Sequence, residues 1–425
     1  MPWLVFAAGA FVYVVAVAHR ASFGVAGLAA VERFGVQAAM LSLFVVVQLA
    51  TYSLLQIPMG VALDRWGAGL LLTFGATVMA VSQLGMAFTS SVGGALALRL
   101  LLGLGDAAVF ISAVRLVWGW FERRLVPVLT QVTGLVGRLG QIITAIPFAF
   151  GLTHYGWQVA FIGLAALGLL SAAIAIVWVR PGPYDSPGLR LSGRPGGLGA
   201  TLTSPGTWLG FFAHLLGGVS SNVFILLWGV PFLVQGHGLT HGQAGVLLTI
   251  NVLVTIVAAP VIGVLTSRHP LRRTWLVLGI SGLTLTGWVL VLLPREPLPF
   301  STLAVFVGLI SIGGPASLIG LDLAAGFNPP AWRGTAQGVA NMGGFISAVV
   351  VMLGVGLMLD ARAPLGNPTL ADYRLALSLV LVPIAIGIAG ILITRGPARR
   401  RAGIVVPTMA ELVARHRARE QAQVK

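Results

Sequence analysis

The stretch Gly60-Val61-Ala62-Leu63-Asp64-Arg65-Trp66-Gly67 separates two long apolar runs of the chain. A related stretch, Gly263-Val264-Leu265-Thr266-Ser267-Arg268, follows 203 residues later, again between two apolar runs. A second pair of similar segments, beginning at Gly134 and Gly338, has nearly the same spacing. Two similarities at one offset indicate that the chain is an internal duplication.

The composition indicates that the apolar runs lie in lipid. Of 425 residues, 57% are hydrophobic and only 9% are charged. A membrane-spanning helix needs roughly 20 mostly apolar residues. We predict an all-α integral membrane protein with twelve spans in two pseudo-symmetric six-helix bundles, at residues 3–29, 37–61, 69–89, 93–119, 127–151, 157–179, 207–234, 242–266, 274–294, 300–325, 334–359 and 374–394.

The distribution of positive charge predicts the orientation of these spans. Of the 26 Lys and Arg residues, four lie inside the runs and four (Arg33, Arg295, Arg362 and Arg374) lie on one side, which leaves 18 on the other. Loops rich in Lys and Arg face the cytoplasm. We therefore predict an integral protein of the inner (plasma) membrane with cytoplasmic N and C termini.

A polar, Gly- and Pro-rich segment divides the two predicted bundles. It is typical of a flexible linker. We predict an N-terminal six-helix bundle at 1–180, a cytoplasmic linker at 181–206, a C-terminal six-helix bundle at 207–395 and a basic cytoplasmic tail at 396–425.

The motif around Asp64 resembles the signature loop of the major facilitator superfamily, and Arg99-Leu100-Leu101-Leu102-Gly103-Leu104-Gly105 is similar to that family's second motif. The resemblance implies a transporter in which Gly60, Asp64, Arg65 and Gly67 serve gating and Arg99, Gly103 and Gly105 belong to the scaffold.

Asp64 is well placed to accept hydrogen bonds from the N-terminus of another helix, such as the span that begins near Gly334. We expect this contact to hold the two halves together at the cytoplasmic side. Arg115, near the cytoplasmic end of span four, is its expected ionic partner; snorkelling to the interface is the alternative interpretation.

Five ionisable side chains inside the apolar runs belong to the first half: Arg20, Arg99, Asp106, Arg115 and Arg138. A charge at bilayer depth costs about 2.5 to 3.5 kcal/mol on insertion scales unless it is compensated. Helix geometry puts Arg20, Asp106 and Arg138 near the bilayer centre. We expect the first six spans to carry charge recognition and the second six to supply a neutral, polar wall.

The positive centre predicts an anionic substrate, because guanidinium groups bind carboxylates and phosphates through paired hydrogen bonds. The segment His19-Arg20-Ala21-Ser22-Phe23 also resembles the first span of the organophosphate:phosphate antiporters and related organic anion transporters. Buried pairing of Arg20 and Arg138 with Asp106 is the structural alternative. The predicted substrate-binding residues are Arg20, Gln48, Tyr52, Arg138, Asn222 and Asn341. Asp106 and His19 are the candidates for a counter-ion or for proton coupling.

The sequence therefore predicts a monomeric secondary active transporter for a small organic anion, which works by alternating access and is coupled to protons or a counter-anion. The alternatives are a proton-driven exporter of drugs or lipids on the same fold, and a non-transporting receptor or integral-membrane enzyme. The expected partners are the substrate, protons or a counter-anion, and membrane lipids.

Several other functions are not supported. Lys425 is the only lysine of the chain, so it has no GxxxxGK[ST] phosphate-binding loop. We predict no enzyme activity, no cofactor and no metal site, and interpret His237 and His241 as solvated loop residues. Basic residues dispersed over loops do not indicate nucleic-acid binding.

Overall fold

The computed structural model describes residues 1–35, 38–184, 197–363 and 368–404. Most of the predicted tail, at residues 405–425, and the middle of the predicted linker lie outside these ranges. The helices of the first half are α1 (Pro2–Val25), α2 (Gly27–Phe34), α3 (Ala38–Leu54), α4 (Gln56–Trp66), α5 (Ala68–Phe88), α6 (Val92–Trp120), α7 (Val126–Gly137), α8 (Leu139–Ile143) and α9 (Ala149–Trp178).

The second half continues the all-helical pattern. Its helices are α10 (Gly197–Leu202), α11 (Pro205–Val223), α12 (Gly229–Pro231), α13 (His241–Arg268), α14 (Arg273–Leu292), α15 (Phe300–Ser311), α16 (Gly313–Gly326), α17 (Arg333–Arg362), α18 (Leu370–Leu377) and α19 (Leu381–Arg401). The last helix therefore continues six residues beyond Arg395, where we placed the end of the second bundle.

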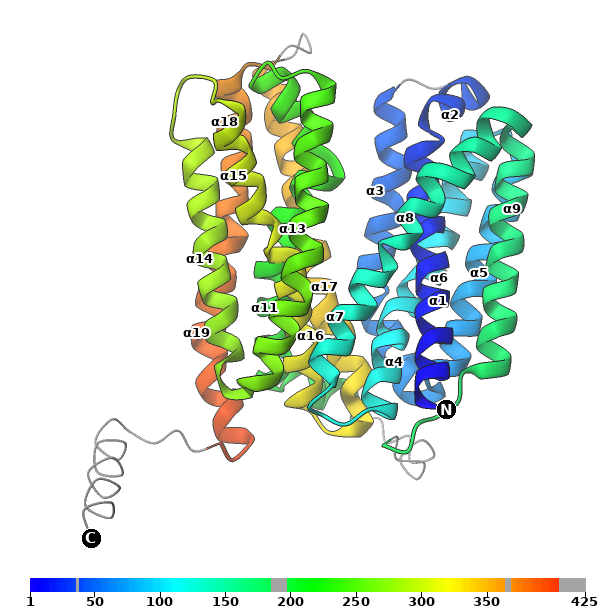
Figure 1. Cartoon of the computed structure of the whole chain (residues 1–425), viewed down its shortest axis with the longest axis vertical. Coiled ribbons are helices and arrows are strands. Elements are labelled where there is room, and N and C mark those ends of the chain that lie inside the picture. Colours follow the sequence, from blue (N-terminus) through cyan, green and yellow to red (C-terminus); the bar gives the residue numbers. More distant parts are fainter. Residues whose placement is uncertain (36–37, 185–196, 364–367, 405–425) are drawn as a thin grey trace.

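Twelve crossings account for the described helices. Ten segments are long and apolar enough to span a bilayer, and the bent pair α3 and α4 adds another crossing. One of the ten, Val126–Trp178, has 53 residues; at 1.5 Å per residue this is about 80 Å, far more than the ~30 Å hydrocarbon core. Gly156, with φ 80°, interrupts its helix. The chain reverses there, so this segment crosses twice (Figure 1).

The crossings form two bundles (Figure 1). One hydrophobic core consists of second-half residues, from Leu209 to Ala398. Another lies mainly in the first half but takes in Leu321 and Ala336 from α16 and α17. Each half therefore packs around its own apolar centre, and the two centres approach each other along α16 and α17.

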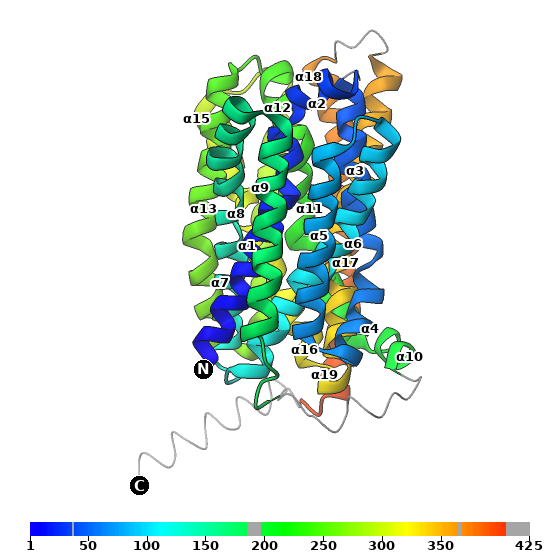
Figure 2. The same ribbon diagram turned by 90° about the vertical axis from the view of Figure 1, so that its right-hand side faces the viewer.

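The halves meet toward one end of the molecule. There α4 packs against α17, and α7 packs against α13 and α16. Figure 2 shows the N-terminus, α4, α16 and the end of α19 at this same end. We call it the basic end, because the turns and helix termini there carry most of the arginines.

The motif from Gly60 to Gly67, expected as a loop, is mostly helical, which corrects that expectation. Gly60 to Trp66 belong to the last turns of α4, and only Gly67 leaves the helix, with φ 82°. A positive φ is readily adopted by Gly alone. One glycine is therefore enough to connect α4 to α5, and Asp64 and Arg65 project from a rigid helix end.

Close helix contact predicts which glycines the fold needs. A Cβ atom at Gly75 of α5 would lie 2.7 Å from the Gly105 carbonyl oxygen of α6, whereas one at Gly163 would meet nothing within 4 Å. We expect Gly75→Ala to destabilise the fold by about 1 to 3 kcal/mol. Gly163→Ala should be neutral or stabilising, because Ala favours helix more than Gly. Thermal unfolding of both variants in detergent tests this; equal midpoints would contradict it.

Candidate functional site

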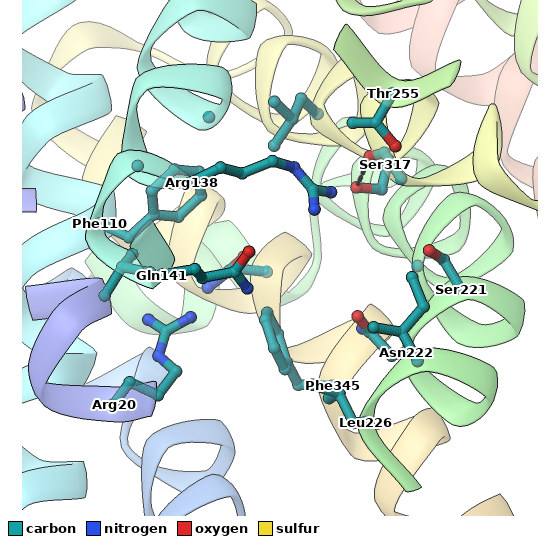
Figure 3. Close-up of a pocket in the computed structure, with 18 of the residues that line it drawn as sticks. Arg20, Phe110, Arg138, Gln141, Ser221, Asn222, Leu226, Thr255, Ser317 and Phe345 are labelled. Atoms are coloured by element: carbon teal, nitrogen blue, oxygen red, sulfur yellow. Dashed lines mark hydrogen bonds between the residues drawn. The ribbon is translucent and has the colours of Figure 1, made fainter. Parts of the chain in front are cut away.

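A cavity of about 470 Å³ lies between the two halves. Its lining comes from α1, α3, α6, α7 and α8 on one side and from α11, α13, α16 and α17 on the other (Figure 3). The structure brings all six residues that we predicted for substrate binding to this cavity: Arg20, Gln48, Tyr52, Arg138, Asn222 and Asn341.

Arg20 on α1 forms an ion pair with Asp106 on α6. Its Nε and Nη2 atoms each donate to a different carboxylate oxygen, both at 2.7 Å. The guanidinium also lies over the Tyr52 ring, 5.0 Å from its centroid. Bidentate pairs of this kind combine strength with a fixed orientation. Asp106 thus neutralises Arg20 at the cavity wall.

Gln48 on α3 connects this pair to Arg99. Its Nε2 lies 3.5 Å from Asp106 Oδ2, and its Oε1 accepts from Arg99 Nη2. Arg99 is buried behind the cavity, with its guanidinium 4.9 Å from the Phe23 ring centroid. Two arginines and one aspartate therefore share a single buried network in which Arg99 braces the wall.

Arg138 lies at the junction of α7 and α8 and extends into the cavity. Figure 3 shows its guanidinium directed across the cavity toward Ser317 and Thr255. Among the described residues, the Arg138 guanidinium has neither a hydrogen bond nor an ion pair. An uncompensated charge at this depth is costly. An anion that entered the cavity would therefore be stabilised most strongly beside Arg138.

The wall contributed by the second half is neutral and polar. It presents Ser221 and Asn222 from α11, Thr255 from α13 and Ser317 from α16. The second half as a whole is not neutral, which corrects our expectation: Asp322 lies in the apolar run at 300–325 and is only 2% exposed. It accepts a hydrogen bond from Thr130 across the interface at 3.3 Å and does not line the cavity.

His19 lies outside the cavity lining. Its Nε2 is 2.9 Å from the Leu164 carbonyl oxygen, and the side chain is 1% exposed. Although it is adjacent to Arg20, it faces the interior of the first bundle. Neither candidate for proton coupling lines the cavity. Asp106 is nevertheless paired with the lining residue Arg20, whereas His19 faces the interior of the first bundle.

The predicted contact of Asp64 with the start of another helix is confirmed. Its Oδ1 accepts from Gly334 N at 2.7 Å, and its Oδ2 accepts from Thr335 N at 2.7 Å and Thr335 Oγ1 at 2.6 Å. Arg115 is close enough to interact electrostatically with this carboxylate. Asp64 thus caps α17 from the other half of the molecule, where the helix dipole favours negative charge.

The remaining motif residues have separate structural roles. Arg65 is exposed and lies over Trp66, 5.8 Å from its ring centroid. A Cβ at Gly60 would come within 2.6 Å of the Gly334 carbonyl oxygen, and one at Gly103 within 2.7 Å of the Gln48 carbonyl oxygen. The small residues therefore permit close helix contact, across the interface at Gly60 and inside the first bundle at Gly103.

Further hydrogen bonds join the halves between the cavity and the basic end. Ser267, the counterpart of Asp64 in the repeat, donates to the Arg124 carbonyl oxygen at 2.7 Å. Gln131 donates to the Pro315 carbonyl oxygen at 2.7 Å. Asn341 donates to Tyr52 Oη at 2.8 Å and to Gln56 Oε1 at 2.7 Å. These contacts form the floor of the cavity.

Some cavity residues were missed by the sequence reasoning. Gln141 and Tyr13 carried a usable signal, since Gln141 follows Arg138 by three positions and Tyr13 precedes Arg20 by seven, which puts each on the same helix face. Ser221, Thr255 and Ser317 carried none, because hydroxyl residues are common between membrane helices.

The interpretation of His237 as a solvated loop residue was wrong. The side chain is buried, its Nδ1 accepts from Leu298 N at 3.1 Å, and its ring packs edge-on against Phe232, with 4.7 Å between centroids. Burial lowers the pKa of His237 to about 4. The residue is therefore a neutral anchor for the loop at the end of α14.

Two helical bundles with a cavity between them, lined in part by arginine, amide and hydroxyl side chains, are typical of a membrane carrier. The family model of the Major Facilitator Superfamily matches residues 9–352 and 210–407. The chain belongs to this superfamily, and it is a multi-pass transmembrane transporter rather than an enzyme.

Curated relatives are distant. The putative tartrate transporter of Agrobacterium vitis is 23% identical over 80% of this chain and 83% of its own length. The probable galactarate/D-glucarate transporter of Escherichia coli (strain K12) is 23% identical, with 82% and 83% covered. An uncharacterized transporter of Bacillus subtilis (strain 168) is 26% identical, but the match spans only 36% of this chain and 35% of that protein.

A solved structure supports the fold. The proton:xylose symporter XylE, bound to 6-bromo-6-deoxy-D-glucose, superposes with a TM-score of 0.66 over 92% of this chain and 96% of its own. At 14% sequence identity, this similarity concerns the fold alone.

The Asp64 contact predicts that Asp64→Asn opens the basic end. The amide keeps the shape but loses the charge, and a hydrogen bond to a charged group contributes about 1.5 to 3 kcal/mol. The chain has no cysteine, so spin labels can be placed at Arg123→Cys and His269→Cys without background. We expect the fraction of molecules with a longer distance between the two labels to be at least about tenfold larger in Asp64→Asn than in the protein that keeps Asp64. An unchanged distance distribution would exclude a gating role; Asp360→Asn, remote from this contact, is the control.

Proposed function

We propose that the protein is a secondary active transporter that moves a small hydroxylated carboxylate by alternating access. The observation that carries the proposal is Arg138, a guanidinium in the cavity that no carboxylate of the described residues neutralises. An anion is the ligand that compensates it best. The uncompensated charge of Arg138 also disfavours the alternative of a cationic drug.

The contacts between the halves favour an outward-facing state. The hydrogen bonds of Asp64, Ser267, Gln131 and Asn341 close the region between the cavity and the basic end. We place the basic end in the cytoplasm, because loops rich in arginine stay on that side. Release of these contacts would open the cavity inward, and the protein would work as a monomer.

The chemistry of the relatives' substrates supports the substrate class. Tartrate, galactarate and D-glucarate, the compounds named for two relatives, are carboxylates that carry several hydroxyl groups. In this cavity Arg138 would take a carboxylate, while the hydroxyl groups would lie against Ser221, Asn222 and Ser317 on the opposite wall.

Coupling would act through the pair of Arg20 and Asp106. When a substrate anion draws Arg20 away, Asp106 loses its partner, and a proton would take the place of the guanidinium. A proton would then travel with the substrate. Exchange against a counter-anion is the other outcome, in which Arg20 passes from one anion to the next while Asp106 stays ionised.

The proposal predicts that Arg138→Gln weakens the binding of anions. Loss of a charge-assisted bidentate contact should weaken binding by at least about tenfold. Thermal stabilisation of purified protein by tartrate, galactarate and glucuronate measures this, with neutral xylose as the ligand control. Arg33→Gln, which removes an arginine outside the cavity, is the matched control variant. Equal stabilisation of Arg138→Gln and wild type would sink the anion assignment.

The coupling model predicts a split phenotype for Asp106→Asn. In liposomes, uptake driven by an inward proton gradient should fall to background, because the amide cannot take up a proton. Exchange of labelled for unlabelled substrate should persist, since the cavity can still reorient when loaded. If gradient-driven uptake survives in the variant, Asp106 is not the coupling site. If wild-type uptake ignores the proton gradient but requires internal anion, the protein is an anion exchanger.

A further inference from the structure

A second cationic site lies far from the cavity, at the basic end between α14 and α19. The last turns of α19 carry Arg395, Arg399, Arg400 and Arg401. Arg395 and Arg399 are four residues apart and so lie on one face of the helix. That face meets Trp275 in the first turn of α14 and Leu271 in the short 3-10 turn, Pro270–Arg272, that precedes it.

The two arginines make different contacts, Arg395 with α14 and Arg399 with the turn that precedes it. The Arg395 guanidinium lies over the Trp275 ring, 4.4 Å from its centroid, and its Nε is buried without a hydrogen-bond partner. Arg399 Nη2 donates to the Leu271 carbonyl oxygen. The two groups are close enough to repel each other electrostatically. Two like charges are thus held together at the surface of the bundle.

Acidic side chains do not relieve this repulsion within the described residues. In the described second half the acids are Glu296, Asp322, Asp360 and Asp372. Only Asp322 lies toward the basic end, and it is buried and bonded to Thr130. The cluster therefore lacks a negative partner among the described residues of the second half.

The surroundings are those of a membrane surface. Trp275 is 55% exposed and Leu271 is 58% exposed, and on α19 Leu392 and Ile393 just before the arginines are exposed as well. Tryptophan at this depth is typical of the level of lipid headgroups. Basic clusters between helix ends on the cytoplasmic side bind the phosphates of anionic lipids.

We propose that Trp275, Arg395 and Arg399, with Arg400 beside them, form a binding site for one anionic phospholipid. The phosphate would lie between the two guanidinium groups, and an acyl chain would follow the apolar strip at Leu392 and Ile393. The site holds α19 against α14. It is independent of the cavity and of the substrate transported.

Native mass spectrometry and thermal unfolding of the full chain in detergent test the site. Wild type should retain and be stabilised by phosphatidylglycerol or diphosphatidylglycerol, and not by phosphatidylcholine. Arg395→Gln with Arg399→Gln should weaken lipid binding by about tenfold or more. Arg123→Gln with Arg124→Gln removes the same charge at the same end but in the first half, and should change binding by less than about twofold.

Other outcomes decide the proposal as well. Trp275→Leu keeps every charge and removes only the ring that orients Arg395, so it should lower the affinity for the anionic lipid by a smaller factor than the double variant. Trp275→Leu also tests the site if the Arg395→Gln, Arg399→Gln variant does not fold. Equal losses in the two double variants would overturn the site in favour of general surface attraction. Equal stabilisation by inorganic phosphate at the same concentration would overturn the lipid as its ligand.

Discussion

The cost of a charge in hydrocarbon constrains the whole molecule, because four arginines lie inside its membrane spans. Arg20 forms a bidentate pair with Asp106. Arg99 donates to the side-chain Oε1 of Gln48 and lies over the Phe23 ring, and Arg115 lies near Asp64. Arg138 alone extends into the cavity without a partner among the described residues. These pairings connect α1, α3 and α6 on the first-half side of the cavity.

The two halves repeat a fold but not its chemistry. At corresponding positions of the repeat, Asp64 caps a helix of the other half with a full charge, whereas Ser267 donates one neutral hydrogen bond to a loop carbonyl. The cavity repeats this difference, with arginines on the wall of the first half and hydroxyl and amide groups on the wall of the second. The two halves thus share an architecture, whereas the arginines that line the cavity come from the first half.

Much of this could be predicted from the sequence, because a bilayer imposes simple rules on length, apolarity and charge. Such rules predict the break between spans five and six and the placement of Arg20 and Arg138 at the central cavity. They also predict the contact of Asp64 with the helix that begins near Gly334. What could not be predicted depends on rotation of each helix about its axis. His19 and Arg20 are neighbours in sequence yet face different environments. Asp322 lies in an apolar run, and its hydrogen-bond partner Thr130 is too distant in sequence for the pair to be predicted.

The lone guanidinium of Arg138 has an electrical consequence. In the alternating-access cycle that we propose, the voltage across the membrane acts on this positive charge whenever the empty carrier reorients. Moving one elementary charge through the whole field changes the free energy by about 2.3 kcal/mol per 100 mV. In a cell with a negative interior, the voltage therefore draws the empty carrier toward the state that faces the cytoplasm. A bound monoanion cancels the charge and with it this bias, so occupancy of the cavity also decides how strongly the membrane potential acts on the transport cycle.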